Sequence, residues 1–168
     1  MVDVLGAVYD FLEEIIGAEN IVRGWQNAAA LPADTDYVVM TLINSERTGT
    51  NTHTLDDEEE TETIGMLNAY SVQVDFCGSD EAEVIEKAAK LVALARDRVA
   101  VNFFGDRGIS CRYADDPRSI PFTNDQNQWT VRYSVVLHLA AWLEVEMPVA
   151  TFTSVDIGIE NVDVHHKT

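Results

Sequence analysis

The chain has 168 residues, with 29 acidic and 11 basic side chains and a formal net charge of −18. Apolar residues make up 46% and charged residues 24%, a balance that predicts one folded domain over residues 1–168 and excludes general disorder. A surface of this sign repels phosphate, so the composition excludes a protein that grips nucleic acid or an anionic membrane with its average surface.

The two cysteines, Cys77 and Cys111, form neither a disulfide framework nor a metal-binding Cys-x-x-Cys pair. We expect two free thiols in a reducing cytoplasm. The first residues lack the basic and long apolar regions of a signal peptide, and no apolar stretch approaches the roughly 18 residues of a membrane span. The sequence therefore predicts a soluble cytoplasmic product.

Apolar residues at intervals of three and four predict an amphipathic helix near the start of the chain. Asp3 is placed to cap its first turn, and Gly17 is placed to end it. Residues 18–36 give no clear pattern, although Pro32 marks a turn before the next element. The apolar positions of this helix are Leu5, Val8, Tyr9, Leu12, Ile15 and Ile16.

Two strand patterns follow, separated by a long polar stretch. Residues 37–44 are mostly apolar and rich in β-forming residues, and residues 70–77 alternate apolar and polar side chains. Residues 45–60 are too long for a tight hairpin turn, so we expect a long loop between the strands. An acidic run, which we expect to project into solvent or against a partner, consists of Asp56, Asp57, Glu58, Glu59, Glu60 and Glu62.

A second helix is predicted from residue 80 to residue 104. Gly78 ends the preceding strand, Ser79 or Asp80 caps the helix, and Gly105 stops it. Alanines along the helix suit close packing on a sheet. We expect one packing face made of Ile85, Ala88, Ala89, Val92, Ala95 and Val99.

The last third of the chain is rich in strand patterns. Residues 109–113 predict a short strand, residues 116–125 a loop, and residues 129–139 a long strand. Pro148 interrupts the pattern, and residues 152–164 give a last β-rich segment. The order of elements predicts an α+β fold, with a mainly antiparallel sheet, two helices packed on one face and a long acidic β-hairpin loop.

Motifs for chemistry are scarce. The sequence has no phosphate-binding loop, dinucleotide fingerprint or nucleophile elbow. His138 lies in an apolar strand, where a hydrogen-bonded sheet residue is favoured over a catalytic base. Solvated loop charges explain Asp115 and Asp116 beside Arg118 better than acid–base catalysis does. We therefore predict no enzymatic activity, no metal and no cofactor.

Other residues have simple or open interpretations. Adjacent His165 and His166 point to opposite sides of an extended tail, so we do not expect them to bind a metal together. Trp129 and Tyr133 match the period of the long strand, so we expect them in the core. Arg132 lies within the same strand. It either pairs with an acid across the sheet or reaches a subunit interface.

The acidic run has three interpretations. It is a solvated surface, as most charge runs are, or a cation site, although it lacks the spacing of a calcium loop. The third interpretation is electrostatic. A wall that DNA must slide past without sticking should be negative, since like charge opposes adsorption. The sequence does not separate the first interpretation from the third.

Several segments in order resemble the tail-terminator (neck) proteins of tailed bacteriophages, over residues 5–164. The resemblance is carried by their order along the chain. They are residues 37–44 followed by Arg47, Gly49 and Thr50, then Gln73–Gly78 leading into an alanine-rich helix, then Ile120-Pro121-Phe122, Gln128-Trp129 and Arg132-Tyr133.

This resemblance implies a ring, usually of six copies, on top of the tail tube, located in the virion after assembly in the host cytoplasm. Such a ring stops tube polymerisation, contacts head-completion proteins and lets DNA pass through its lumen. The resemblance transfers no catalytic residue. We expect the acidic run to face the lumen or the tube, and Arg47 and Arg132 to pair between subunits.

Two alternatives stay open. The first is another head–tail connector or tail-completion adaptor, because such small proteins share similar sizes and layouts. The second is a small α+β enzyme or ligand-binding domain with a pocket on the sheet between Arg132 and His138.

Overall fold

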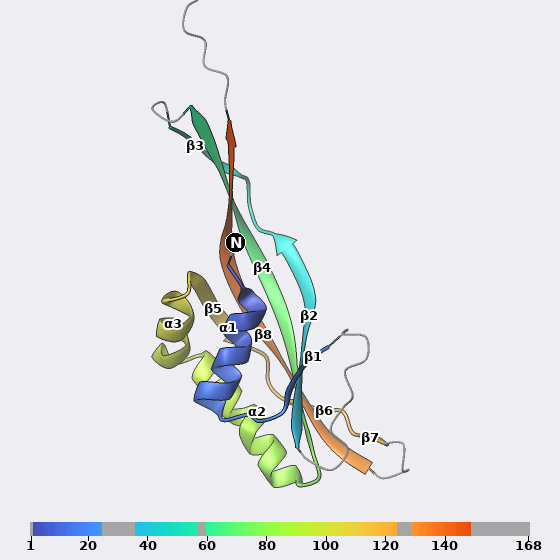
Figure 1. Ribbon diagram of the computed structural model, residues 1–168. Helices are drawn as coiled ribbons and strands as arrows, with labels where there is room; N and C mark the ends of the chain where they lie inside the picture. Colours follow the sequence, from blue (N-terminus) through green and yellow to red (C-terminus); the bar gives the residue numbers. More distant parts are fainter. Residues whose placement is uncertain (1, 25–35, 57–59, 124–128, 149–168) are drawn as a thin grey trace, which may run out of the picture.

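The computed structural model describes residues 2–24, 36–56, 60–123 and 129–148. Figure 1 shows one twisted sheet, helices against one of its faces, and a narrow arm of strands that extends beyond the helices. The strands are β1 (Ile21–Arg23), β2 (Tyr37–Arg47), β3 (Thr52–Asp56), β4 (Thr61–Gly78), β5 (Ile109–Ala114), β6 (Arg118–Ser119), β7 (Phe122–Thr123) and β8 (Trp129–Pro148). The helices are α1 (Val4–Asp10), the π-helical η1 (Phe11–Ile16), α2 (Glu81–Ala95) and α3 (Arg98–Gly105).

The main sheet has the strand order β1-β2-β4-β8-β5. The pairings of β2, β4, β8 and β5 are antiparallel, and only β1 runs parallel to its neighbour β2. The short strands β6 and β7 pair with the start of β8 inside the segment predicted as a loop. The α+β class and the mainly antiparallel sheet are therefore confirmed.

Local signals set the ends of the first helical segment as predicted. The Asp3 carboxylate accepts a hydrogen bond from the Gly6 amide at 2.8 Å, and Gly17 takes the left-handed conformation (φ 75°) that ends many helices. The terminal Ile16 carbonyl accepts a hydrogen bond from the Lys90 ammonium at 2.9 Å. This contact joins the first helical segment to α2.

The predicted second helix is two helices. Asp97 interrupts it, and its carboxylate caps α3 by accepting from the Val99 amide at 3.0 Å. The predicted packing face is also partly wrong, because Ile85 is 41% and Val99 39% exposed. The face that contacts the sheet consists of Val84, Ala88, Leu91 and Ala95.

The long loop predicted for residues 45–60 is wrong in its extent. Strand β2 continues to Arg47, and β3 follows on the same edge of β4 after a short connection. Strand β4 begins at Thr61, well before the predicted residue 70. Asp56 at the end of β3 and Glu60 just before β4 are described members of the acidic run, whereas residues 57–59 fall outside the described part of the chain.

The core lies between the helices and the covered face of the sheet. Three aromatic rings form its centre, with ring centroids of Phe11 and Phe104 4.9 Å apart and those of Phe103 and Phe104 5.4 Å apart. Phe11 and Phe104 are fully buried. Trp129, predicted in the core, is 75% exposed at the start of β8, beyond the reach of the helices. The strand predicted at residues 152–164 lies outside the described residues.

Close packing at Gly78 gives a testable prediction. A Cβ atom there would approach the Val84 side chain to 2.8 Å, besides contacting Asp36. We expect Gly78→Ala to lower the free energy of unfolding by about 1–3 kcal/mol through overpacking. Gly105→Ala is the matched control, because nothing lies within 4 Å of its Cβ position, and we expect no loss. Urea titration of both variants measures the difference, and equal stabilities would contradict this packing.

Candidate functional site

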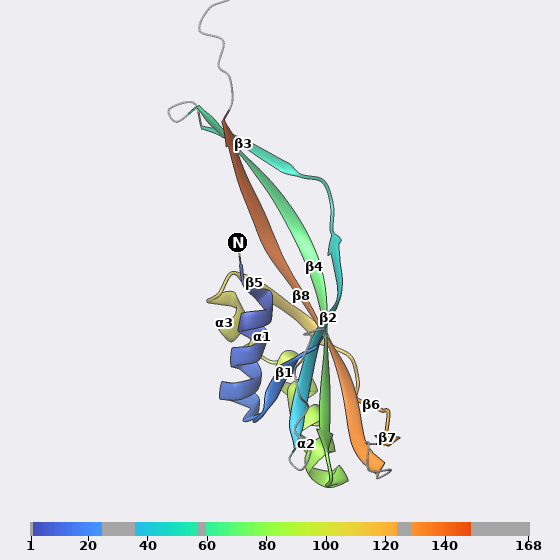
Figure 2. The ribbon, with the colours of Figure 1, turned by 45° about the vertical axis from the view of Figure 1, so that its right-hand side comes forward.

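The most distinctive part of the structure is the distal arm, which we define as β3 with residues 61–67 of β4 and 142–148 of β8. Figures 1 and 2 show that it projects past the helices. No register shift interrupts the pairing of β4 with β8. Since side chains alternate along a strand, residues 143, 145 and 147 point to the same face as the core residues Leu137 and Leu139. The helix-side face of the sheet thus continues onto the arm.

That continuation is mainly apolar, and none of the described helices lies over it. Its cross-strand partners include Ile64 opposite Val145 and Met66 opposite Leu143. Leu55 is 63% exposed, Met147 49% and Val145 48%. We call this surface the apolar arm face, after its apolar side chains Leu55, Ile64, Met66, Leu143, Val145 and Met147. His53, opposite Ile64, and Glu62, opposite Leu55 and Met147, lie on the same face.

The opposite face of the arm is polar and acidic. Glu144 lies opposite Gly65, and Glu146 lies opposite Thr63. The Thr52 side chain occupies the place beside Gly65 where a larger residue would have its side chain, and the Trp142 ring lies next to it. The arm is therefore amphipathic, although it stands away from the core. Large exposed apolar surfaces on soluble proteins usually mark interaction sites.

The described members of the acidic run lie at or near the tip of the arm. Asp56 ends β3 and Glu60 turns the chain with φ 51°, and both are exposed. Glu62 is half-buried, and its carboxylate lies 2.7 Å from Nδ1 of His53. The three members Asp57, Glu58 and Glu59 lie outside the described residues. Whether the run faces a lumen or a tube remains a proposal.

The two arginines predicted between subunits lie far apart in the sheet register. Arg47 is exposed at the end of β2, opposite Asn68. Arg132 is opposite Cys77, and its Nε donates to the Ile120 carbonyl at 3.1 Å. The described residues show no acid paired with Arg132 across the sheet. Its bond holds the segment between β6 and β7 against β8.

Basic residues gather on the body, away from the arm. Residues 87–118 contain seven basic residues against four acidic ones, a local net charge of +3 in a chain of −18. Helix α3 packs on the edge strand β5 in this region. We call its exposed surface the basic flank, and it comprises Arg98, Val99, Val101 and Arg112. The sequence reasoning missed this segregation, which a running charge count along the chain would have found.

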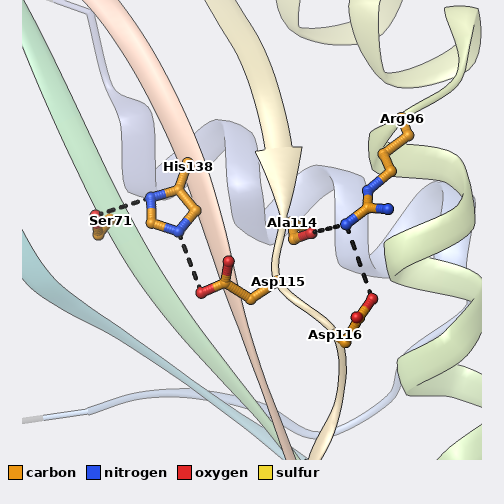
Figure 3. Close-up of polar contacts among 6 residues, drawn as sticks. All are labelled: Ser71, Arg96, Ala114, Asp115, Asp116 and His138. Atoms are coloured by element: carbon orange, nitrogen blue, oxygen red, sulfur yellow. Dashed lines mark hydrogen bonds and ion pairs between the residues drawn. The ribbon is translucent and has the colours of Figure 1, made fainter.

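A polar cluster lies on the sheet face away from the helices (Figure 3). Nδ1 of His138 is 3.2 Å from the Ser71 hydroxyl, and its Nε2 is 3.4 Å from the Asp115 carboxylate. The Tyr113 ring stacks on the imidazole with centroids 4.4 Å apart. The prediction of a hydrogen-bonded sheet residue is confirmed.

The cluster has the residue types of a nucleophilic triad, but its geometry has a simpler cause. Ser71 and His138 are direct cross-strand partners, so their contact follows from the register. Asp115 comes directly after β5, and its amide donates to the Val136 carbonyl at 2.9 Å. Its neighbour Asp116 lies 3.8 Å from the Arg96 guanidinium, which also donates to the Ala114 carbonyl (Figure 3). These contacts fix the end of β5 to the sheet and to α2.

A cleft of about 320 Å³ lies elsewhere, between the end of η1, the start of β2 and the start of α2. Its lining includes neither His138 nor Arg132, the residues between which a pocket was predicted as one alternative. Lys87 and Asp36 line it and lie 3.6 Å apart. This ion pair across the cleft joins α2 to the residue before β2.

The cysteine thiols are poor nucleophiles at neutral pH. Burial raises the pKa of Cys77 to about 11, and it does the same for Cys111. Both thiols are free. Since the thiolate is the reactive form, they remain inert and protonated under ordinary conditions. Burial also raises the pKa of the neighbouring Tyr37 to about 12.

Within the described ranges, no group of three or more His, Cys, Asp and Glu side chains is arranged to hold a metal ion. None of the helices in the described part of the chain has the length and apolar character needed to cross a membrane.

Together, the fold and these surfaces define a small α+β protein with a projecting amphipathic arm and segregated charge. The model of the phage neck terminator protein family matches residues 3–165, and the chain belongs to this family. It is thus a component of the neck of a tailed phage, as the resemblance predicted. A comparison with curated proteins finds none that matches.

Proposed function

We propose that the protein forms a ring at the head-proximal end of the tail tube, ends tube polymerisation there and joins the tail to the head. Family membership over residues 3–165 is the observation that carries this proposal. The apolar arm face supports it, because a monomer leaves Leu55, Val145 and Met147 about half exposed or more. Apolar surface of this kind gains free energy when a partner covers it.

The net charge suits a channel for DNA. Six copies at −18 each would give a ring of −108. DNA that passes through such a lumen is repelled by the wall, so it does not adsorb. The acidic run at the arm tip faces either this lumen or the tube, and Arg47 and Arg132 remain candidates for inter-subunit pairing. The protein acts by shape and self-association, without catalysis, during assembly in the host cytoplasm.

The proposal is tested with purified protein and purified tail tube protein. Light scattering measures whether the chain forms a closed oligomer, and negative-stain microscopy measures tube length and the appearance of tube ends. We expect rings at tube ends and shorter tubes as the amount of this protein rises. A chain that stays monomeric at high concentration and neither caps nor shortens tubes contradicts the proposal.

Cross-linking separates this role from that of another head–tail connector or adaptor. A tube terminator links to the tube protein and to a head-completion protein. A connector on the head side links to the portal and leaves tube length unchanged.

A further inference from the structure

The apolar arm face is a sheet face without a partner in the described structure, and charge indicates what covers it. The same face carries the acid Glu62, which lies opposite Leu55 and Met147 in the strand register, and the exposed acids Asp56 and Glu60 lie beyond it. A partner surface should therefore combine exposed apolar side chains with positive charge. In a chain of net charge −18, few surfaces meet both requirements.

The basic flank of a second copy meets them. Val101 is 54% and Val99 39% exposed on α3. Arg98 and Arg112 are exposed, and neither has an ion-pair partner among the described residues. Arg98 is also the first residue of α3, where the helix dipole disfavours a cation within the same chain. An arginine held there is suited to an acid brought by another molecule.

The sheet geometry fits the same contact. Strand β5 is the last strand on its side of the sheet, and its outer edge has no strand beside it in the described residues. Helix α3 covers β5 on the helix side. If the arm of a second copy lies along this edge with its apolar face on the helix side, that face contacts the exposed side chains of α3. Addition of a strand to an exposed edge is a common mode of recognition.

We propose that the apolar arm face of one copy docks on the basic flank of the next copy. This inference rests on the proposed ring, and it names the surfaces through which the ring forms. The two surfaces differ, so the contact is head to tail, and a head-to-tail contact closes into a ring when the rotation between copies allows it.

The test uses cysteine pairs in the full-length chain. Val99 and Val101 flank the buried stripe of α3 on opposite sides, so each is paired with the arm in turn. We expect Val145→Cys with Val101→Cys, or with Val99→Cys, to give a disulfide-linked ladder of dimers, trimers and larger species under mild oxidation. Wild type, with its native Cys77 and Cys111, and the three single variants control for other links.

Val145→Cys with Ile85→Cys is the matched control pair, because Ile85 is 41% exposed on α2, outside the basic flank. We expect no ladder from it. The reaction is run on the protein alone and on protein bound to tube ends. If tubes are capped normally and neither arm–α3 pair links, the docking inference falls and the proposed function stands. If tubes are not capped and no ladder forms, the docking inference and the proposed function are both contradicted.

A charge exchange provides a second, independent measurement. Glu62→Lys, which reverses the charge on the docking face, should lower oligomer formation at least tenfold, and Arg98→Glu with Arg112→Glu should do the same. Mixing the two variants should restore association as mixed dimers, because the lysine introduced in one variant can pair with the glutamates introduced in the other. The inference is overturned if the mixture associates no better than either variant alone. It is also overturned if Val145→Cys links only to itself or only to the tube protein.

Discussion

Phe104→Ala is expected to lower the free energy of unfolding by about 3–5 kcal/mol, out of a total of roughly 5–15 kcal/mol for a domain of ordinary stability. Phe104 is fully buried, and its ring packs against those of Phe11 and Phe103, which also contact each other. These rings join α3 to η1, so the substitution leaves a cavity where two helical segments meet. Part of the chain population should then be unfolded at ordinary temperatures.

Thermal and urea unfolding followed by circular dichroism measure this effect. The corresponding loss in melting temperature is roughly 6–20 °C for a chain of this size. Val101→Ala is the matched control, because Val101 lies on the same helix but is 54% exposed, and we expect a change within about 0.5 kcal/mol. A loss below about 1 kcal/mol for Phe104→Ala would show that the helices are not packed on the sheet as described.

Replacing the five acids Asp56–Glu60 by serine is expected to leave the fold intact and to reduce infectious titre at least tenfold in a phage that depends on this chain. The described members Asp56 and Glu60 are exposed, and exposed charges contribute little to stability. The substitution removes five negative charges from each copy, and the described residues Asp56 and Glu60 lie at the tip of the arm. Any surface that works by repelling DNA, or by fitting a charged tube end, is weakened.

Two measurements locate the defect. If the variant caps tubes normally but titre falls, the run acts on DNA passage. If capping also fails, the run faces the tube. A variant with the five acids Glu13, Glu14, Glu19, Glu83 and Glu86 replaced by serine controls for net charge, because these acids are exposed on the body, away from the arm. Normal titre from the tip variant would show that the acidic run is solvated surface without a role.

Local signals account for what the sequence predicted correctly. Asp3 and Gly17 bound the first helical segment, and Asp80 caps α2 through the Ala82 amide at 2.8 Å. Each of these signals acts within a few residues of the chain, so it can be recognised without the tertiary structure. The alternation of apolar and polar residues in β4 and β8 is also a local signal, and it predicted that these segments are strands of a sheet.

The errors arise where neighbours far along the chain decide the outcome. Asp97 is the exception, because its cap on α3 is a local contact with the Val99 amide two residues on, and the sequence reasoning took it for one more charge on an amphipathic helix. Residues Thr52–Asp56 are exposed and polar, which suggested a loop, yet pairing with β4 makes them a strand.

The candidate site was harder to predict than the fold. The acidic run was evident in the sequence, and the structure puts its described members at or near the tip of the arm. The apolar arm face was not evident, because it depends on the register of Leu55 and Ile64 against β4 and β8. The contact of His138 with Asp115 was also missed, since these residues are 23 positions apart and meet through a strand pairing.

The unbroken pairing of β4 with β8 has a mechanical consequence. The two strands run side by side from Thr61 and Pro148 at the tip to Gly78 and Val131 in the body. Interstrand hydrogen bonds lie across the strand direction, so a force that enters at the tip of one strand and leaves at the body end of the other loads all of them in shear together. The arm can therefore carry tension from its tip into the body without a hinge that would yield first.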